Sequence, residues 1–193
     1  MMKLSIIELA NPHVRLVPVH ESHRAAINAA SSIEPEGFAW WPRAMATPEQ
    51  RDATFTWLLG EQAKGTWLPF TVIAPNGEVV GQTCYLNPVS EHERVEVGGT
   101  WYAPSARGTA INPAAKLLML GHAFACGAGR VELKTDALNA RSRAAMLKMG
   151  AQFEGIHRRH MLMPGNRWRD TAWFSVIESE WPKVKAGLEA RLG

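Results

Sequence analysis

A basic loop followed by an expected helix, near the middle of the chain, has the residue types needed to bind an anion. Arg107, Gly108 and Thr109 stand just before Asn112 and Pro113. We predict that Asn112 caps the helix and that Pro113 takes its first position, because proline lacks the N–H group that would be unpaired there. Free N–H groups, the positive end of the helix dipole and a guanidinium together favour phosphate. The loop therefore predicts a phosphate-bearing ligand.

The elements expected around this loop alternate between strands and helices. The segments predicted as strands are 14–18, 67–74, 78–86, 94–102, 130–135, 152–159 and 171–177. The segments predicted as helices are 20–30, 47–64, 113–126, 139–149 and 182–192. Asn76-Gly77 favours a hairpin turn, and Gly98-Gly99 favours a bulge or bend in its strand. We find no repeat or linker, and we expect residues 31–48 to be irregular within one domain spanning residues 1–193.

Composition limits the class of protein. The chain has 193 residues, of which 46% are hydrophobic and 20% charged, which suits one α/β or α+β domain. No apolar run reaches the roughly 18 residues of a membrane span, and Glu8 interrupts the N-terminal apolar stretch, so we expect a cytoplasmic protein. A net charge of +3 favours a small anion over nucleic acid. Cys84 and Cys126 match no metal or redox spacing, so we expect buried thiols and no metal.

Two motifs in this context resemble the GCN5-related N-acetyltransferase (GNAT) superfamily, in its ribosomal-protein N-terminal acetyltransferase-like branch. The segment 107–112, Arg-Gly-Thr-Ala-Ile-Asn, resembles the acyl-CoA loop of that family. The segment 139–142, Asn-Ala-Arg-Ser, resembles a second family motif, with Lys148 and Gly150 at its later positions. The order of expected strands and helices matches the family over nearly the whole chain.

The chain departs from the family pattern at two functional positions. Ala110 stands where the family usually has glycine, so its φ must be negative, because a Cβ disfavours the left-handed region. Met146 stands where many relatives carry a tyrosine that acts as a general acid. Another group must therefore supply that proton if the chain is an enzyme.

The resemblance implies a mixed, mostly antiparallel sheet of about seven strands, flanked by helices and splayed at its centre to bind acyl-CoA. It implies acetyl-CoA as co-substrate. The residues expected to bind it are Trp101, Tyr102, Ala103, Arg107, Gly108, Thr109, Ala110, Ile111, Asn112, Asn139 and Ser142. The side chains of Trp101 and Tyr102 could equally pack in the core. Asn139 could serve only as the cap of its own helix.

Two residues are candidates for proton transfer. Glu96 alternates with Val95 and Val97, which places it on the opposite face of its strand, where it could accept a proton from an amine. It could also be a solvated strand residue or the partner of an arginine. Ser142 lies one turn beyond Asn139 and could donate a proton to the leaving thiolate, or be an ordinary surface serine.

The acceptor side is expected in the irregular segment, where relatives build one wall of the acceptor cleft. Trp40, Trp41 and Arg43 could grip an amine or an apolar group, or could fill the core. His157 and His160 are weaker candidates for a base.

The expected activity is acetyl transfer to a primary amine, which could be a small amine, an amino-acid derivative or a peptide N-terminus. The alternatives are a non-catalytic acyl-CoA-binding module and, less well supported by the modest charge, a nucleic-acid or ribosome-associated protein. The expected sheet edges would allow a homodimer.

Overall fold

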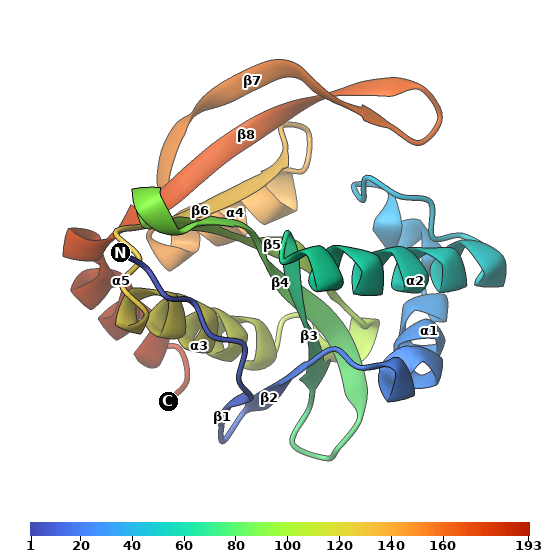
Figure 1. The fold of residues 1–193 in the computed structure, drawn as a ribbon, viewed down its shortest axis with the longest axis horizontal. Coiled ribbons are helices and arrows are strands. Elements are labelled where there is room, and N and C mark those ends of the chain that lie inside the picture. The colour runs from blue at the N-terminus through green and yellow to red at the C-terminus, as the bar shows by residue number, and fades with distance from the viewer.

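An eight-stranded sheet organises the chain, and the computed structural model describes all of residues 1–193 (Figure 1). The strands are β1 (Leu9–Asn11), β2 (Val14–Pro18), β3 (Trp67–Ile73), β4 (Val79–Val89), β5 (Arg94–Tyr102), β6 (Arg130–Asp136), β7 (Gln152–Met163) and β8 (Arg167–Ile177). Their order across the sheet is β1-β2-β3-β4-β5-β6-β8-β7. All neighbours are antiparallel except β5 and β6, which are parallel.

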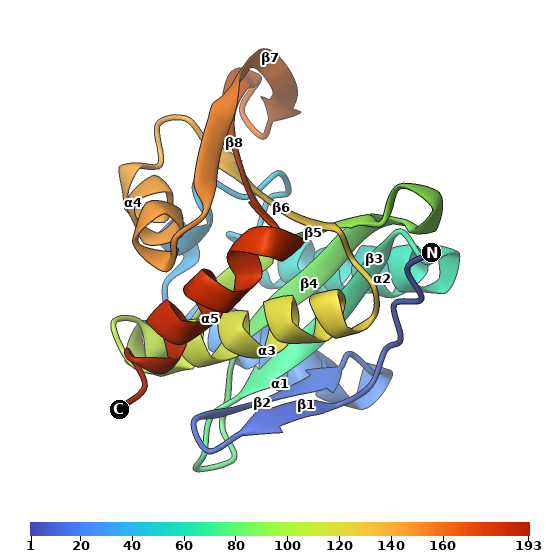
Figure 2. The same cartoon turned by 90° about the vertical axis from the view of Figure 1, so that its left-hand side faces the viewer.

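Five helices cover the two faces of this sheet. They are α1 (Arg24–Ser32), α2 (Pro48–Lys64), α3 (Ile111–Ala125), α4 (Ala140–Met149) and α5 (Trp181–Glu189). Figure 2 shows α3 and α5 across one face, with α1 and α2 behind the sheet. The β7–β8 hairpin projects from one end in both views. The expected mixed, mostly antiparallel architecture is confirmed, with β1 as one strand more than predicted.

The start of α3 differs from the prediction. The helix begins at Ile111, its N-cap is Ala110, and Asn112 is therefore not the cap. Thr109 explains the earlier start, because its Oγ1 accepts the N–H of Ile111 at 3.2 Å and closes the turn before the helix. Pro113 falls at the third helical position, where its missing N–H is still one of the four that lack an intrahelical partner.

The core on the α3 side consists of apolar side chains from one face of the central strands and from the helix. Val95 and Val97 of β5 are at most 1% exposed, and they share one cluster with Met119 and Leu120 of α3. Burial of these side chains fixes which face of β5 is turned away from the core. Glu96, between the two valines, must therefore point to the other face.

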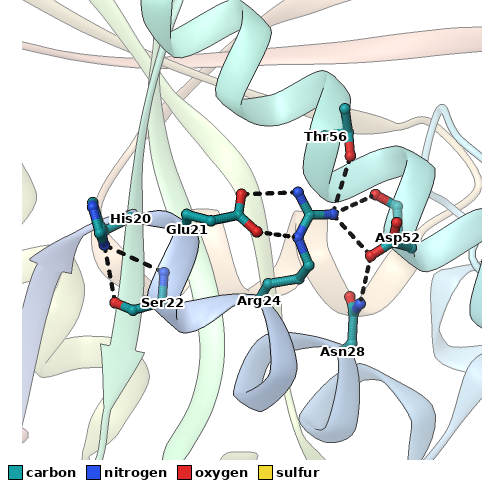
Figure 3. Close-up of polar contacts among 7 residues, drawn as sticks. All are labelled: His20, Glu21, Ser22, Arg24, Asn28, Asp52 and Thr56. Carbon is teal, nitrogen blue, oxygen red and sulfur yellow. Dashed lines mark hydrogen bonds and ion pairs between the residues drawn. The ribbon is translucent and has the colours of Figure 1, made fainter.

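Arg24 holds α1 against α2 on the other side of the sheet (Figure 3). Its guanidinium bonds to both carboxylate oxygens of Glu21, at 2.5 and 2.9 Å, and to Oδ1 of Asp52 at 2.8 Å. The same group lies 4.6 Å from the ring centroid of Phe55. The α1–α2 connection, which contains Trp40 and Trp41, runs between the two helices that Arg24 joins.

A bulge lies in β5 where the glycine pair predicted one. Gln82 pairs with Trp101 and Cys84 pairs with Gly98, so β5 carries one residue more than β4 between these pairs. Gly99 has φ +54°, a value that glycine adopts without the steric cost of a Cβ. The bulge bends β5 at the level where it leaves β6.

Candidate active site

A cleft of about 610 Å³ opens where β5 and β6 separate. The two strands pair only from Arg94 with Arg130 to Glu96 with Glu132, and beyond this point each lacks the other as a neighbour. The sequence-predicted residues that line the cleft are Trp40, Trp41, Glu96, Trp101, Tyr102, Arg107, Gly108, Asn112, Asn139 and Ser142. Those that do not line it are Arg43, Ala103, Thr109, Ala110 and Ile111. Segments far apart in sequence thus meet at one fork in the sheet.

The loop before α3 presents unpaired backbone N–H groups. The amides of Gly108, Thr109, Ala110 and Asn112 donate no hydrogen bond within the protein, whereas that of Ile111 bonds to Thr109. Gly108 has φ +75°, and Ala110 has φ −65°, so the alanine fits without strain. Adjacent free amides at the start of a 15-residue helix favour an anion.

Arg107, which precedes this row of amides, already has partners within the protein. Its Nε donates to the carbonyl oxygen of Tyr102 at 2.9 Å, and its Nη1 contacts the Glu34 carboxylate. A Cβ on Gly37 would lie 2.9 Å from Nη2 of Arg107, so glycine leaves room for the guanidinium. An anion at the loop would compete with Glu34 for Arg107.

Asn139 caps α4, and Ser142 stands at the same end of that helix. The Oδ1 of Asn139 accepts the N–H of Ser142 at 3.0 Å, while the side-chain NH₂ donates to no protein group. The hydroxyl of Ser142 has no hydrogen-bond partner in the protein and lines the cleft. Both side chains therefore keep polar atoms free to contact a ligand. Gly150 ends α4 at φ +103°, as predicted.

Glu96 is the buried carboxylate of the cleft, at 3% exposed. Burial raises the pKa of Glu96 above its ordinary value, and Lys134 opposes this, with its Nζ 2.7 Å from Glu96 Oε2. Glu96 therefore forms an ion pair with a lysine, whereas the sequence had suggested an arginine as its possible partner. Alternation along β6 makes Glu132 and Lys134 share a face, but the sequence alone does not show that this face meets Glu96.

Lys116 is a second cation that the sequence analysis did not single out. It comes from α3, lines the cleft, and its Nζ donates to Thr100 Oγ1 at 3.2 Å. Burial lowers the pKa of Lys116 to about 8. A positive group therefore lies beside the β5 bulge. No recognisable motif marks it in the sequence.

The two tryptophans of the α1–α2 connection, Trp40 and Trp41, differ in their exposure and contacts. Trp41 is 8% exposed and packs edge-on against Phe38, with ring centroids 6.0 Å apart. Trp40 is 37% exposed on the cleft wall. Arg43 lies outside the cleft, with its guanidinium 4.5 Å from the centroid of the Trp57 ring. Trp101, at 8% exposed, belongs to the same apolar cluster as Trp41.

The remaining sequence candidates do not reach the cleft. The rings of His157 and His160 pack against Trp173, with centroids 5.2 and 5.8 Å away. The amide of Ala103 donates to the Val80 carbonyl at 2.8 Å and is therefore occupied. Cys84 is buried as expected, but Cys126 is partly exposed, because it lies at the end of α3.

Two classes of feature are absent from the chain. No group of three or more His, Cys, Asp or Glu side chains is placed to hold a metal ion. None of the helices combines the length and apolar character that crossing a membrane requires.

Comparison with known proteins adds sequence and structural relatives. A family model described as the acetyltransferase (GNAT) domain matches residues 13–152. The crystal structure of a GCN5-related N-acetyltransferase from Brucella melitensis is 32% identical, with a TM-score of 0.88 over 98% of this chain and 86% of that one. Mycobacterium smegmatis RimJ, solved in complex with CoA-disulfide, is 27% identical, with a TM-score of 0.79 over 95% and 92% of the two chains. No curated protein matches the sequence significantly.

Proposed function

Because the chain belongs to the GNAT acetyltransferase family, we propose that it transfers the acetyl group of acetyl-CoA directly to a primary amine. The family resemblance predicted from the two motifs is thereby confirmed, and GNAT acetyltransferases use acetyl-CoA. The observation that carries the proposal is the fork between β5 and β6, with free amides at one end and a buried carboxylate at the other.

The cleft and the loop before α3 together fit acetyl-CoA. The free amides of Gly108, Thr109, Ala110 and Asn112 would hold its diphosphate, and the unpaired side-chain NH₂ of Asn139 would bond to the pantetheine arm. Backbone groups of β5 beyond Glu96, which lack a partner on β6, would pair with the same arm. Acetyl-CoA supplies an activated acetyl thioester and a thiol leaving group.

Glu96 is the proposed base. A primary amine is protonated at neutral pH and must lose a proton before it can attack, and a carboxylate can accept this proton directly or through one water. Lys134 favours the ionised form of Glu96, which is the form that accepts a proton. The 3% exposure of Glu96 keeps bulk water away from this proton transfer.

Ser142 is the proposed proton donor to the leaving thiolate. Its hydroxyl is free and lines the cleft, and Met146, where relatives carry tyrosine, has no proton to give. A backbone N–H of β5 at the fork would polarise the acetyl carbonyl, a contribution of roughly 3 kcal/mol in other acyl transfers. Trp40 and Trp41 would form part of the acceptor wall.

Thiol release is the direct test. We expect the protein to release CoA thiol from acetyl-CoA when supplied with at least one amine from a panel of small amines, amino acids and peptides, and to bind acetyl-CoA in calorimetry. Binding without thiol release for the whole panel would support the alternative, a non-catalytic acyl-CoA-binding module. Absence of binding at millimolar acetyl-CoA would overturn both.

A further inference from the structure

Arg169 is a buried guanidinium at the edge of the cleft with no acidic partner. It lies in β8, is 5% exposed and lines the cleft. Its Nε donates to Thr171 Oγ1 at 3.0 Å, and neither Nη group donates to any protein atom. The protein does not fully bury these Nη groups, and Arg169 is one of the residues that line the cleft.

The two carboxylates whose charges act on Arg169 are already paired. Asp136, whose side chain is fully buried, lies 2.6 Å from Nη2 of Arg167, and Glu96 lies 2.7 Å from Lys134. A buried charge without a partner is costly, and removal of water by a bound ligand would increase that cost. The missing partner is one that a ligand can provide. Arginine binds carboxylate through two parallel hydrogen bonds.

We propose that the acceptor is a small amine that carries a carboxylate, and that Arg169 binds this carboxylate while Glu96 receives the amine. The inference rests on the proposed acetyl transfer and specifies its acceptor. Glu96 and Arg169 line the same cleft, from the strands β5 and β8 that lie on either side of β6. A ligand with a positive amine and a negative carboxylate complements this pair.

Apolar side chains on the walls of the cleft favour a free amino acid with an apolar side chain. Met161 pairs with Arg169 across the β7–β8 hairpin, and Met161, Trp40 and Trp67 line the same cleft. The guanidinium of Arg167 lies 5.7 Å from the Trp40 ring centroid, so the β7–β8 hairpin contacts the α1–α2 connection. Both segments contribute residues to the cleft, so this contact bounds it on one side, which favours a small ligand over a peptide chain.

The test compares acids with their neutral amides. Thiol release is measured with L-phenylalanine and L-methionine, with L-phenylalaninamide and L-methioninamide, and with a short peptide amide that has a free N-terminus. For the native protein we expect kcat/KM to be at least about tenfold higher for the acids, since losing one partner of a buried charge pair costs at least about tenfold. In R169Q the value for the acids falls to that of the amides.

Three further measurements separate a carboxylate site from a structural role. R169K keeps the charge but loses the paired donors, so we expect an intermediate KM for the acids. The affinity for acetyl-CoA stays unchanged in R169Q. Arg158 is an exposed arginine on the same hairpin with no polar partner, so the R158Q variant should behave as the native protein. An equal loss of activity toward acids and amides in R169Q, or a loss of acetyl-CoA affinity, would overturn the assignment.

A measurement of product binding, which does not require acetyl transfer, distinguishes failure of this inference from failure of the proposed function. We expect calorimetry to detect N-acetyl-L-phenylalanine binding to the CoA-loaded native protein but not to loaded R169Q. Such binding without thiol release from any acceptor would keep the carboxylate site and refute acetyl transfer. Equal or faster transfer to the amides or the peptide amide would keep acetyl transfer and refute the carboxylate site, as would failure of the product to bind.

Discussion

The guanidinium of Arg107 contacts the carboxylate of Glu34, which lies 73 residues earlier in the chain. Arg107 belongs to the loop proposed to hold the diphosphate. Glu34 lies in the α1–α2 connection, which also contains the tryptophans proposed to face the acceptor. The two halves of the cleft are therefore joined by one ion pair, which a bound phosphate would weaken.

Removal of the Glu34 carboxylate should tighten acetyl-CoA binding. In E34Q the guanidinium of Arg107 no longer has a competing anion, and we expect the Kd for acetyl-CoA to fall about three- to tenfold, as for a partly exposed ion pair of about 1 kcal/mol. In R107A the Kd should rise. Glu36 provides the matched control, because it lines the cleft without an ion pair and E36Q should leave the Kd unchanged. Calorimetry that shows weaker binding in E34Q would contradict the competition.

Replacement of Glu96 should remove the acidic limb of the pH profile. In E96Q we expect kcat at neutral pH to fall about 10²-fold or more, with unchanged acetyl-CoA affinity. Burial raises the pKa of Glu96 above 4.5, so activity of the native protein should rise with pH through that higher value as the carboxyl ionises. The measurement is kcat/KM against pH.

Lys134 should influence the pH at which the acidic limb of the activity profile falls. Because the ammonium opposes the rise in the pKa of Glu96, the K134M substitution should move the limb to higher pH. A pH–activity profile of K134M identical to that of the native protein would exclude this coupling between Lys134 and Glu96.

The raised pKa of Glu96 also affects stability, because the folded protein holds this proton more tightly than the unfolded chain. The contribution of Glu96 to the free energy of unfolding should therefore decrease as pH rises from 4.5 through its folded pKa.

Two substitutions of Asn139 separate its cap from its ligand contact. N139A removes the hydrogen bond to the Ser142 N–H and should lower the free energy of unfolding by about 1 kcal/mol. N139D keeps the cap but replaces the free NH₂ with a negatively charged oxygen. We expect weaker acetyl-CoA binding in both variants, with loss of stability in N139A alone. Native affinity in N139D would show that Asn139 is only a cap.

Gly99 should tolerate no side chain. In G99A the Cβ would lie 2.9 Å from Trp67 Cζ3 at a φ of +54°, so strain and a close contact combine. We expect a loss of about 1–3 kcal/mol in unfolding free energy, together with slower turnover because the bulge shapes the cleft. Gly77 at φ +88° has open space around its Cβ position, so G77A measures the backbone strain alone. Equal denaturant midpoints for the two variants would show that Trp67 makes room.

Local sequence patterns were sufficient for most of the elements. The Asn76-Gly77 turn, the Gly98-Gly99 bulge and the Gly150 helix end all depend on the backbone freedom of one or two residues, and each lies where predicted. The start of α3 differs from the prediction, because Thr109, three residues before the expected cap Asn112, accepts the N–H of Ile111. The three-residue β1 lacks a pattern of its own and exists by pairing with β2.

The sequence by itself determined the family motifs and placed Glu96 opposite the apolar face of β5, since strand alternation follows from the chain alone. Only the tertiary structure decided the partners of the charged groups. Lys134 reaches Glu96, Glu34 reaches Arg107, and Arg169 is left without a carboxylate. Pairing between residues distant in the chain depends on which strands and helices pack together, and on which charges burial has removed from water.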